Sequence, residues 1–506
     1  MAQIWKIWKA SHTPFKDAGS DTFVLATPNG NILWTCDASV INQLFAQHGK
    51  CQVPLELVKF YDIWGPTVGS VENDEWRAHR KVISAGFNTA INSVVWKEGQ
   101  HQTQTLIDHW IEEGSVIPTV KEWTSRLALH VISSGFFNKR LGWKEYADGA
   151  KPVTPGHKLS FEDALFTVLK RLATVFMTPR KLLGILPGKF FEEANDGFTE
   201  WTKYMQELRQ GTVAHIDEVS MKKNKSILEA IVVAGTPGIG DQPLPEESIL
   251  GNIFFTLLAG HETTGNTMAF IMLLMAVHPD YQKRVQEDLD RQLGGRPKEE
   301  WTVEQDYATL QKGWVGAVQK EVLRLYCVAQ FILRGTVAPC TVVDSKGQSH
   351  TIPANTLTLI NFAAAFQNPA AWPKRTGISE KRRAELHNTP ALDFDPSRWL
   401  DTDDTPDTKE NQDYPLWFPF GQGPRSCIGR AFAQIEMTSV VATIFKDYSL
   451  ELVVEEKMLR ACNGDKTLAW EKTRDKAMIM LYDDIEANIS IFLAKELPIR
   501  VVKRPH

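Results

Sequence analysis

The segment that most constrains this chain runs from Phe420 to Gly429. It reads Phe-Gly-Gln-Gly-Pro-Arg-Ser-Cys-Ile-Gly, a Gly/Pro turn that ends in Cys427 immediately before a predicted helix over residues 428–446. The unpaired amides and the dipole at the start of a helix favour negative charge, and therefore the thiolate form of Cys427. Gly423 and Gly429 allow the backbone to approach a flat cofactor closely. The segment predicts a thiolate ligand for such a cofactor.

Two side chains of the same segment suit a cofactor site. Phe420 shields the sulfur from water, and backbone amides near the sulfur tune its electron donation. Arg425 offers a cation to an anionic group of the cofactor. The alternative interpretation is a structural cysteine in a tight turn, and the other motifs of the chain weigh against it.

Length and composition limit the classes of protein to consider. The chain has 506 residues, of which 43% are hydrophobic, and we expect a single domain over residues 1–506. The net charge of −5 and the mixing of basic with acidic residues argue against a nucleic-acid partner. The remaining cysteines show no metal-binding spacing, so we interpret them as small buried side chains in a protein of a reducing compartment. They are Cys36, Cys51, Cys327, Cys340 and Cys462.

Periodicity predicts a mainly helical protein with a small β region. Helices are expected over residues 103–112, 164–175, 199–218, 246–278, 280–293, 310–326 and 428–446. Strands are expected over residues 22–25, 31–36, 336–343, 356–361, 450–454 and 497–503. The helix over 246–278 is apolar but polar at its centre, a pattern typical of a buried helix rather than of a membrane span.

The polar centre of that helix is the second motif, Ala259-Gly260-His261-Glu262-Thr263-Thr264. Gly260 removes bulk and leaves room for a small molecule such as dioxygen. Thr263 is expected to donate a hydrogen bond to the carbonyl of Ala259 and open a local groove. Glu262 beside it is placed to pass protons through water. Taken alone, such a centre is more often a packing kink.

Two further pairs have helical spacing. Glu321 and Arg324 share one face of a helix, and a buried pair of this kind needs a third partner to complete its hydrogen bonds. Trp76 and Arg80 are four residues apart and also share a face. The plain alternatives are a surface ion pair for the first and surface packing for the second.

Together these motifs resemble those of the cytochrome P450 family. Residues 420–429 match every fixed position of the family's Phe-x-x-Gly-x-Arg-x-Cys-x-Gly loop, and residues 259–264 match its Ala/Gly-Gly-x-Asp/Glu-Thr-Thr/Ser motif. Glu321-x-x-Arg324 precedes Phe394-Asp395-Pro396-Ser397-Arg398-Trp399, which is similar to the family's Phe-x-Pro-x-Arg-Phe, with Trp399 in place of the last Phe. Trp76-x-x-x-Arg80 is similar to the family's Trp-x-x-x-Arg helix. The four motifs follow the family's order.

The resemblance implies the family's mainly α fold and a role for each motif. Cys427 would be the axial ligand of haem b, and Arg398 would close a structural triad with Glu321 and Arg324. Thr263 and Glu262 would deliver protons to dioxygen. The other residues implied to contact the haem are Trp76, Arg80, Arg334, Arg425, Phe420, Gly260 and Gly429, with propionate contacts from Trp76, Arg80 and Arg334.

The implied activity is that of a monooxygenase, which inserts one oxygen atom from O2 into a small, largely apolar substrate, here in secondary metabolism. Electrons would come from NADPH through the flavins of a separate reductase, and we expect a monomer. The segment 325–330 lacks the prolines that the family often has there, so the resemblance carries no substrate to this chain. The alternatives are a peroxide-rearranging haem enzyme that needs neither O2 nor reductase, and a non-enzymatic haem sensor or carrier.

The fungal, microsomal character of the sequence implies a place on the cytosolic face of the endoplasmic reticulum. Relatives of that type usually carry an N-terminal anchor, and we expect this chain either to be truncated or to bind the membrane peripherally. Ile4, Trp5, Ile7 and Trp8 alternate with lysines and would suit contact with a membrane surface. The same residues would equally suit a first segment that packs on the protein body.

Overall fold

The computed structural model describes residues 6–28, 30–143, 153–222, 225–240, 243–372, 377–400 and 417–505. The chain divides into two compact units. The first unit comprises Met1–Gln52, Val95–Val131 and His261–His506, and the second comprises Val53–Val94 and Ile132–Gly260. Three of the four boundaries between the units fall within helices, namely α5 (Thr89–Glu112), α6 (Val120–Phe137) and α13 (Glu246–Val277), and the fourth follows Gln52.

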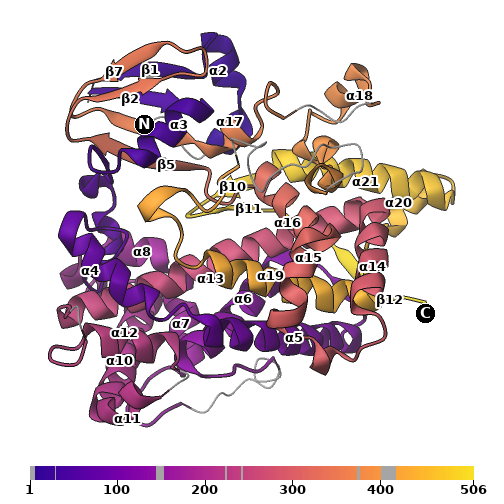
Figure 1. Ribbon diagram of the computed structural model, residues 1–506. Coiled ribbons are helices and arrows are strands. Elements are labelled where there is room, and N and C mark those ends of the chain that lie inside the picture. Colours follow the sequence, from indigo (N-terminus) through magenta and orange to yellow (C-terminus); the bar gives the residue numbers. More distant parts are fainter. Residues whose placement is uncertain are drawn as a thin grey trace. The chain divides into compact units, whose positions relative to one another are not determined.

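The first unit contains all the described strands and arranges them in four small sheets. The largest has the order β1-β2-β8-β5-β3, in which β2 and β8 are parallel and the other pairs are antiparallel. Helices α3 and α17 lie beside this sheet in Figure 1. The strands of this sheet are β1 (Thr22–Thr27), β2 (Gly30–Thr35), β3 (Cys51–Gln52), β5 (Phe331–Thr336) and β8 (Leu357–Asn361).

The other sheets are smaller and antiparallel. One has the order β4-β12-β9, and two are hairpins, β6-β7 and β10-β11. Their bounds are β4 (Val116–Ile117), β6 (Cys340–Val343), β7 (Ser349–Ile352), β9 (Tyr448–Leu452), β10 (Ile485–Ala487), β11 (Ile491–Leu493) and β12 (Ile499–Lys503).

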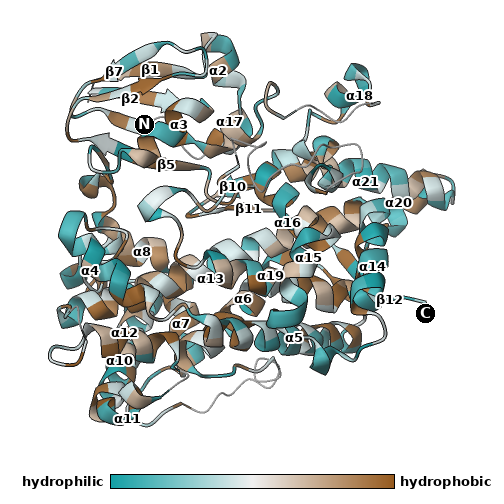
Figure 2. Ribbon diagram, in the orientation of Figure 1, coloured by the Kyte–Doolittle hydropathy of each residue, from teal (hydrophilic) through white to brown (hydrophobic). Residues whose placement is uncertain are grey.

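The helices of the first unit follow from amphipathic stretches such as α14, which buries one face and shows hydrophilic residues on the other in Figure 2. They are α1 (Ile7–Ala10), α2 (Thr13–Ala18), α3 (Ala38–Ala46), α14 (Pro279–Leu293), α15 (Ala308–Lys312), α16 (Trp314–Leu325), α17 (Phe362–Phe366), α18 (Glu380–Glu385), α19 (Arg430–Asp447), α20 (Glu456–Ala461) and α21 (Lys466–Asp483). Among these helices, periodicity predicted α14, α19 and the stretch that forms α15 and α16, and it gave no range for the others.

The second unit is helical in its described part. Trp201 of α10 is fully buried in this unit, and its ring packs against Phe137 and Phe161. Helix α12 begins with a capping box between Ser226 and Glu229. The helices of this unit are α4 (Asn73–Ser84), α7 (Phe161–Lys170), α8 (Leu172–Met177), α9 (Arg180–Leu183), α10 (Lys189–Ala214), α11 (Ile216–Met221) and α12 (Ile227–Gly235).

The predicted mainly α fold with a small β region is therefore confirmed. Besides the helices without a predicted range, the errors lie at breaks within elements. The helix expected over 310–326 is divided at Gly313, whose backbone is extended between α15 and α16. The strand expected over 336–343 is two strands, because β5 ends at Thr336 and β6 starts at Cys340. Apolar periodicity carries no signal for breaks of this length.

The N-terminal segment corrects one expectation about membranes. Ile7 and Trp8 are each only 2% exposed, and the Trp8 indole donates a hydrogen bond of 2.9 Å to the carbonyl of Leu325 and stacks on Tyr326. These two residues pack on the protein body and are not placed to touch a membrane; Ile4 and Trp5 lie outside the described residues. Within the described ranges, none of the helices combines the length and apolar character needed to cross a bilayer.

Helix α19 contains one carboxyl group that opposes folding at neutral pH. Glu436 is fully buried, and neither of its oxygens has a hydrogen-bond partner among the described residues. Burial raises the pKa of this carboxyl well above its ordinary 4.5. The folded chain therefore keeps the proton above pH 4.5 while the unfolded chain releases it, so this group lowers the stability increasingly as pH rises from 4.5 toward the folded pKa.

We therefore expect Glu436→Met to raise the melting temperature at pH 7 by about 1–4 °C. The gain over the wild type should shrink as the pH approaches 4.5, where the unfolded carboxyl also becomes protonated. Calorimetry of the two proteins across this pH range measures it. A melting temperature at pH 7 that is unchanged or lower would show that Glu436 is stabilised in the folded state.

Candidate active site

The loop before α19 presents Cys427 through a defined backbone turn. Gly421 and Gly423 have φ angles of +67° and +70°, which residues with a side chain rarely adopt. The Cys427 amide donates a hydrogen bond of 2.9 Å to the carbonyl of Phe420 and closes the loop. Gly429 is the N-cap of α19, so Cys427 lies at the positive end of an 18-residue helix.

Cys427 differs from every other cysteine of the chain in its accessibility. Its side chain is exposed, whereas the other five cysteines are buried. A soft sulfur donor that is held open at a helix N-terminus fits the single thiolate ligand of a haem iron. The residues present therefore fit a haem. The prediction that the other five cysteines are buried is confirmed.

Strand β5 brings Arg334 to the same loop. The ring of Phe45 lies 5.9 Å from the Arg334 guanidinium, and a Cβ at Gly423 would lie 3.1 Å from the Phe45 carbonyl oxygen. Ile332, two residues earlier on β5, approaches Gly421. Arg334 is only 8% exposed, so the structure holds a nearly buried cation beside the cysteine loop. Such a cation suits an anionic group such as a propionate.

Gly423 and Gly260 have reasons for being glycine that the sequence did not show. Gly423 is required by its positive φ and by its closeness to Phe45. At Gly260, a Cβ would lie 2.4 Å from the terminal methyl carbon of Ile132. A side chain at residue 260 would therefore require Ile132 to shift, and the room expected there for a small molecule stays a prediction.

The polar centre of α13 contains contacts between distant parts of the first unit. Ser490 donates a hydrogen bond of 2.9 Å to a carboxylate oxygen of Glu262, and its own oxygen accepts one of 2.8 Å from the Asn266 amide. The Thr267 hydroxyl donates to the carbonyl of Thr263 at 2.8 Å. Glu262 and Thr263 are partly buried, and the residues around them on α13 are mostly fully buried.

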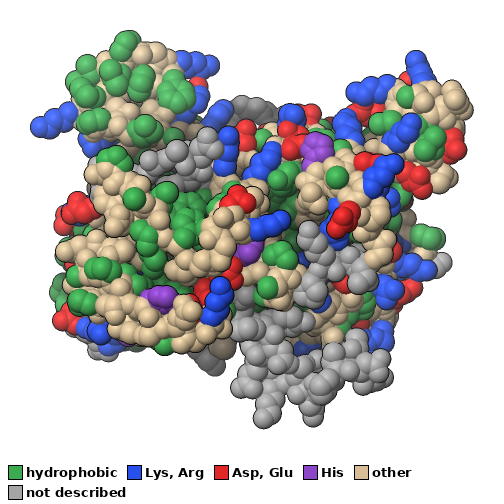
Figure 3. Space-filling model, turned by 90° about the horizontal axis from the view of Figure 1, so that it is seen from above, with side chains coloured by type: hydrophobic (Ala, Val, Ile, Leu, Met, Phe, Trp, Pro, Cys, Tyr) green, Lys and Arg blue, Asp and Glu red, His purple; other side chains and the backbone are tan. Residues whose placement is uncertain are grey.

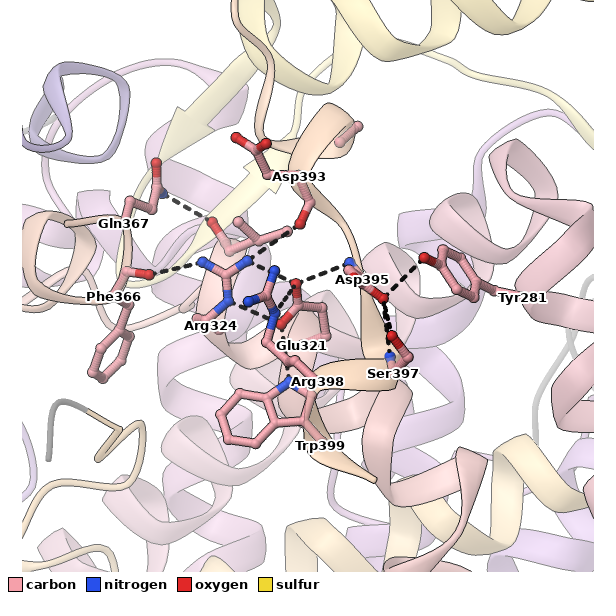
Figure 4. Close-up of polar contacts among 12 residues, drawn as sticks. Tyr281, Glu321, Arg324, Phe366, Gln367, Asp393, Asp395, Ser397, Arg398 and Trp399 are labelled. Atoms are coloured by element: carbon pink, nitrogen blue, oxygen red, sulfur yellow. Dashed lines mark hydrogen bonds and ion pairs between the residues drawn. The ribbon is translucent and has the colours of Figure 1, made fainter. Parts of the chain in front are cut away.

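Glu321 on α16 is the centre of a buried ionic cluster (Figure 4). Its carboxylate is fully buried and accepts two hydrogen bonds from Arg324, at 2.7 and 2.9 Å, and one from Arg398 at 3.1 Å. The Trp399 indole donates a further bond at 2.9 Å, and the Asp395 amide donates another at 3.0 Å. The tryptophan that departs from the family pattern therefore adds a donor, which phenylalanine lacks.

Two chains of contacts connect this cluster to the segment that leads into the cysteine loop. The Trp399 ring packs against Trp417 at 5.2 Å. Arg324 donates to the carbonyl of Phe366 at 3.0 Å, and the Phe366 ring meets Phe418 at 5.1 Å. Because Trp417 and Phe418 lie just before the cysteine loop, the ionic cluster positions the start of that loop.

The second unit places Trp76 and Arg80 on one face of α4. The Arg80 guanidinium lies over the Trp76 ring at 5.8 Å, and Trp76 is 9% exposed. Nearby in the sequence, Arg77 is mostly exposed and pairs with Asp74. On the molecular face that Figure 3 shows, basic and acidic side chains are interspersed rather than gathered by sign.

Sequence reasoning missed several residues of these sites. Asn266 lies four residues after Glu262, so helical spacing alone would have placed it on the same face. Ser490 is 228 residues from Glu262 and carries no local signal. Only the fold brings such a residue to its partner.

Comparison with known proteins identifies the family. The family model for cytochrome P450 matches residues 65–476. A cytochrome P450 monooxygenase of Arthrobotrys oligospora is 26% identical over 95% of this chain and 85% of its own length. A cytochrome P450 monooxygenase of the phomenoic acid biosynthesis cluster of Leptosphaeria maculans is 23% identical over 88% of this chain and 79% of its own length.

The fold agrees with this assignment. The crystal structure of another cytochrome P450 superposes with a TM-score of 0.70 over 97% of each chain, at 20% sequence identity. The predicted P450 fold is thereby confirmed. The chain belongs to the cytochrome P450 family, and the enzyme is a monooxygenase.

Proposed function

We propose that this chain oxidises a small, largely apolar organic molecule in fungal secondary metabolism, with haem b bound through Cys427. The observation that carries the proposal is the exposed Cys427 at the start of α19, in a loop that buried contacts hold in place. The haem supplies the redox-active iron at which dioxygen is reduced. Relatives named as fungal monooxygenases support the pathway class.

The chain's own residues supply binding and charge complementarity. Cys427 would hold the haem iron through its sulfur, and Phe420 and Gly429 border it in the loop. Trp76, Arg80 and Arg334 are the residues proposed to bind the propionates, and Arg425 offers a further cation to an anionic group of the cofactor. A guanidinium pairs with a carboxylate through two parallel hydrogen bonds, which fixes the plane of the bound group as well as its charge.

Substrate recognition rests on an aromatic cluster of the second unit. Tyr61 meets Phe60 at 4.0 Å, Phe176 at 6.2 Å and Phe255 at 5.5 Å. Phe60 is 47% exposed, so the cluster presents apolar area to a ligand. Such a surface binds apolar molecules through buried area and ring contacts rather than through hydrogen bonds. A spectral titration with a compound library, in which a bound substrate displaces iron-bound water, would identify the class.

The electrons are proposed to come from NADPH through a flavin-containing P450 reductase. The peroxide-rearranging alternative needs no such partner, so NADPH dependence of product formation separates the two. Association with the endoplasmic reticulum, the monomeric state and the single-domain organisation of residues 1–506 remain predictions.

Protons reach the oxygen through Glu262 and Thr263. We expect Thr263→Ala to raise the peroxide formed per NADPH and to lower product per NADPH about tenfold, because a misplaced proton releases reduced oxygen before it is used. The measurement compares NADPH, peroxide and product with the first compound that the library titration yields. Thr267→Ala, one turn further along α13, is the matched control and should keep the wild-type ratio. Unchanged coupling in Thr263→Ala would remove Thr263 from this role.

A further inference from the structure

The carboxylate of Glu262 is held by a residue from the far end of the chain. Ser490 lies in the turn between β10 and β11, is 1% exposed, and donates its hydroxyl to Glu262 at 2.9 Å. Its own oxygen accepts a hydrogen bond from Asn266 at 2.8 Å. A hydroxyl oxygen has two lone pairs, so this contact leaves one acceptor position of Ser490 for a further donor.

Asn266 connects this contact to a pocket. The pocket has a volume of about 190 Å³, and its walls include Lys121, Asn266, Ala269, Phe270, Leu273 and Phe492. The Asn266 side chain is 1% exposed, and its carbonyl oxygen has no hydrogen-bond partner among the described residues. A buried amide oxygen normally has a partner, and a pocket of this size is large enough for water molecules to provide it.

The negative charge of Glu262 acts on Lys121, a residue of the same pocket. Lys121 lines the pocket, and its ammonium group lies 3.3 Å from the centre of the Phe492 ring. Burial lowers the pKa of Lys121, and the negative charge of Glu262 opposes that shift. The walls of the pocket therefore hold a cation and an amide oxygen in need of a donor, and the Asn266 side chain links this wall to Ser490 and so to Glu262.

We propose that this pocket, named here the Asn266 pocket, is the entrance for protons that pass from solvent to Glu262, with Ser490 and Asn266 as its positioning residues. A hydronium ion that enters the pocket from solvent passes its proton through a water molecule to the free lone pair of the Ser490 oxygen, while the Ser490 hydroxyl proton moves to the carboxylate oxygen of Glu262. The hydronium ion becomes water, Ser490 is again a neutral hydroxyl group, and Glu262 becomes a neutral acid. Asn266 keeps the Ser490 oxygen in line for this exchange. The inference rests on the proposed role of Glu262.

The test uses the holoenzyme with a fungal NADPH–P450 reductase and no substrate, so that NADPH consumption is the signal. We expect Ser490→Ala to slow consumption about tenfold and to increase the ratio of rates in H2O and D2O. Ser490→Thr, which keeps the hydroxyl, should restore both values. Ser449→Ala is the matched control, because Ser449 also accepts a side-chain amide hydrogen bond, from Gln286 at 2.9 Å, and should match the wild type.

A second readout does not depend on turnover. In a thermal double-mutant cycle, Ser490→Ala should lower the melting temperature in the wild type and have a smaller effect in Glu262→Ala, because the two residues share one hydrogen bond. Additive shifts would overturn the proposed contact. If Glu262→Ala changes NADPH consumption but Ser490→Ala matches Ser449→Ala, the entrance is refuted and the role of Glu262 stands. If Glu262→Ala itself changes neither the rate nor the isotope ratio, the proposed proton role of Glu262 fails as well.

Discussion

Cys427→Ala is expected to abolish monooxygenase activity and the red-shifted absorption band that the reduced protein shows with carbon monoxide. The shift arises because a negatively charged sulfur donates electron density through the iron, and alanine has no donor atom. The other cysteines are buried in the fold and are not presented by the loop that precedes α19. Because the Cys427 side chain is exposed, its removal should change the free energy of unfolding of the haem-free chain by less than about 1 kcal/mol.

Cys462→Ala is the matched control and should behave in the opposite way. Cys462 is 3% exposed, so its truncation removes buried contacts and should cost about 1–2 kcal/mol of stability while the red-shifted band and the activity remain. The two variants together separate ligation from packing. A red-shifted band that survives in Cys427→Ala would assign the iron ligand to another residue.

The sequence predicted best those parts of the site that are local in the chain. The cysteine loop could be interpreted because its turn, its cysteine and the start of α19 are contiguous, and positive φ angles at Gly421 and Gly423 fit the glycines there. The helical spacing of Glu321 and Arg324 likewise predicted their contact. In such segments, each residue is explained by contacts with residues that are close to it in the sequence.

The features that the sequence did not reveal depend on packing between distant segments. Ile132 approaches Gly260, and Ser490 contacts Glu262, and neither approach has a signature in the sequence. Trp8 could have faced a membrane by its amphipathic pattern, yet it packs on Tyr326. Patterns of apolar residues give the faces of elements but not their partners.

Trp399, in the ionic cluster around Glu321, needs both the sequence and the structure to be understood. Trp399 departs from the family pattern in the sequence, and only the structure shows that its indole donates to Glu321 and that its ring packs on Trp417. The Glu321 carboxylate therefore holds two guanidinium groups and one indole, and through the ring contacts it also positions the entry to the cysteine loop.

Glu321→Gln is for this reason expected to destabilise the protein by about 3–5 kcal/mol and to cause loss of bound haem. The carboxylate offsets part of the charge of Arg324, which is 3% exposed, and of Arg398, whose side chain is 11% exposed. A neutral amide removes the carboxylate charge that both guanidinium groups share in a buried setting. Thermal unfolding and the ratio of haem to protein absorbance measure the two effects. The matched control is Glu456→Gln, which removes the exposed pair with Arg460, side chains 80% and 78% exposed, and should stay within about 0.5 kcal/mol of the wild type. Equal stability of the two variants would contradict a structural role for the cluster.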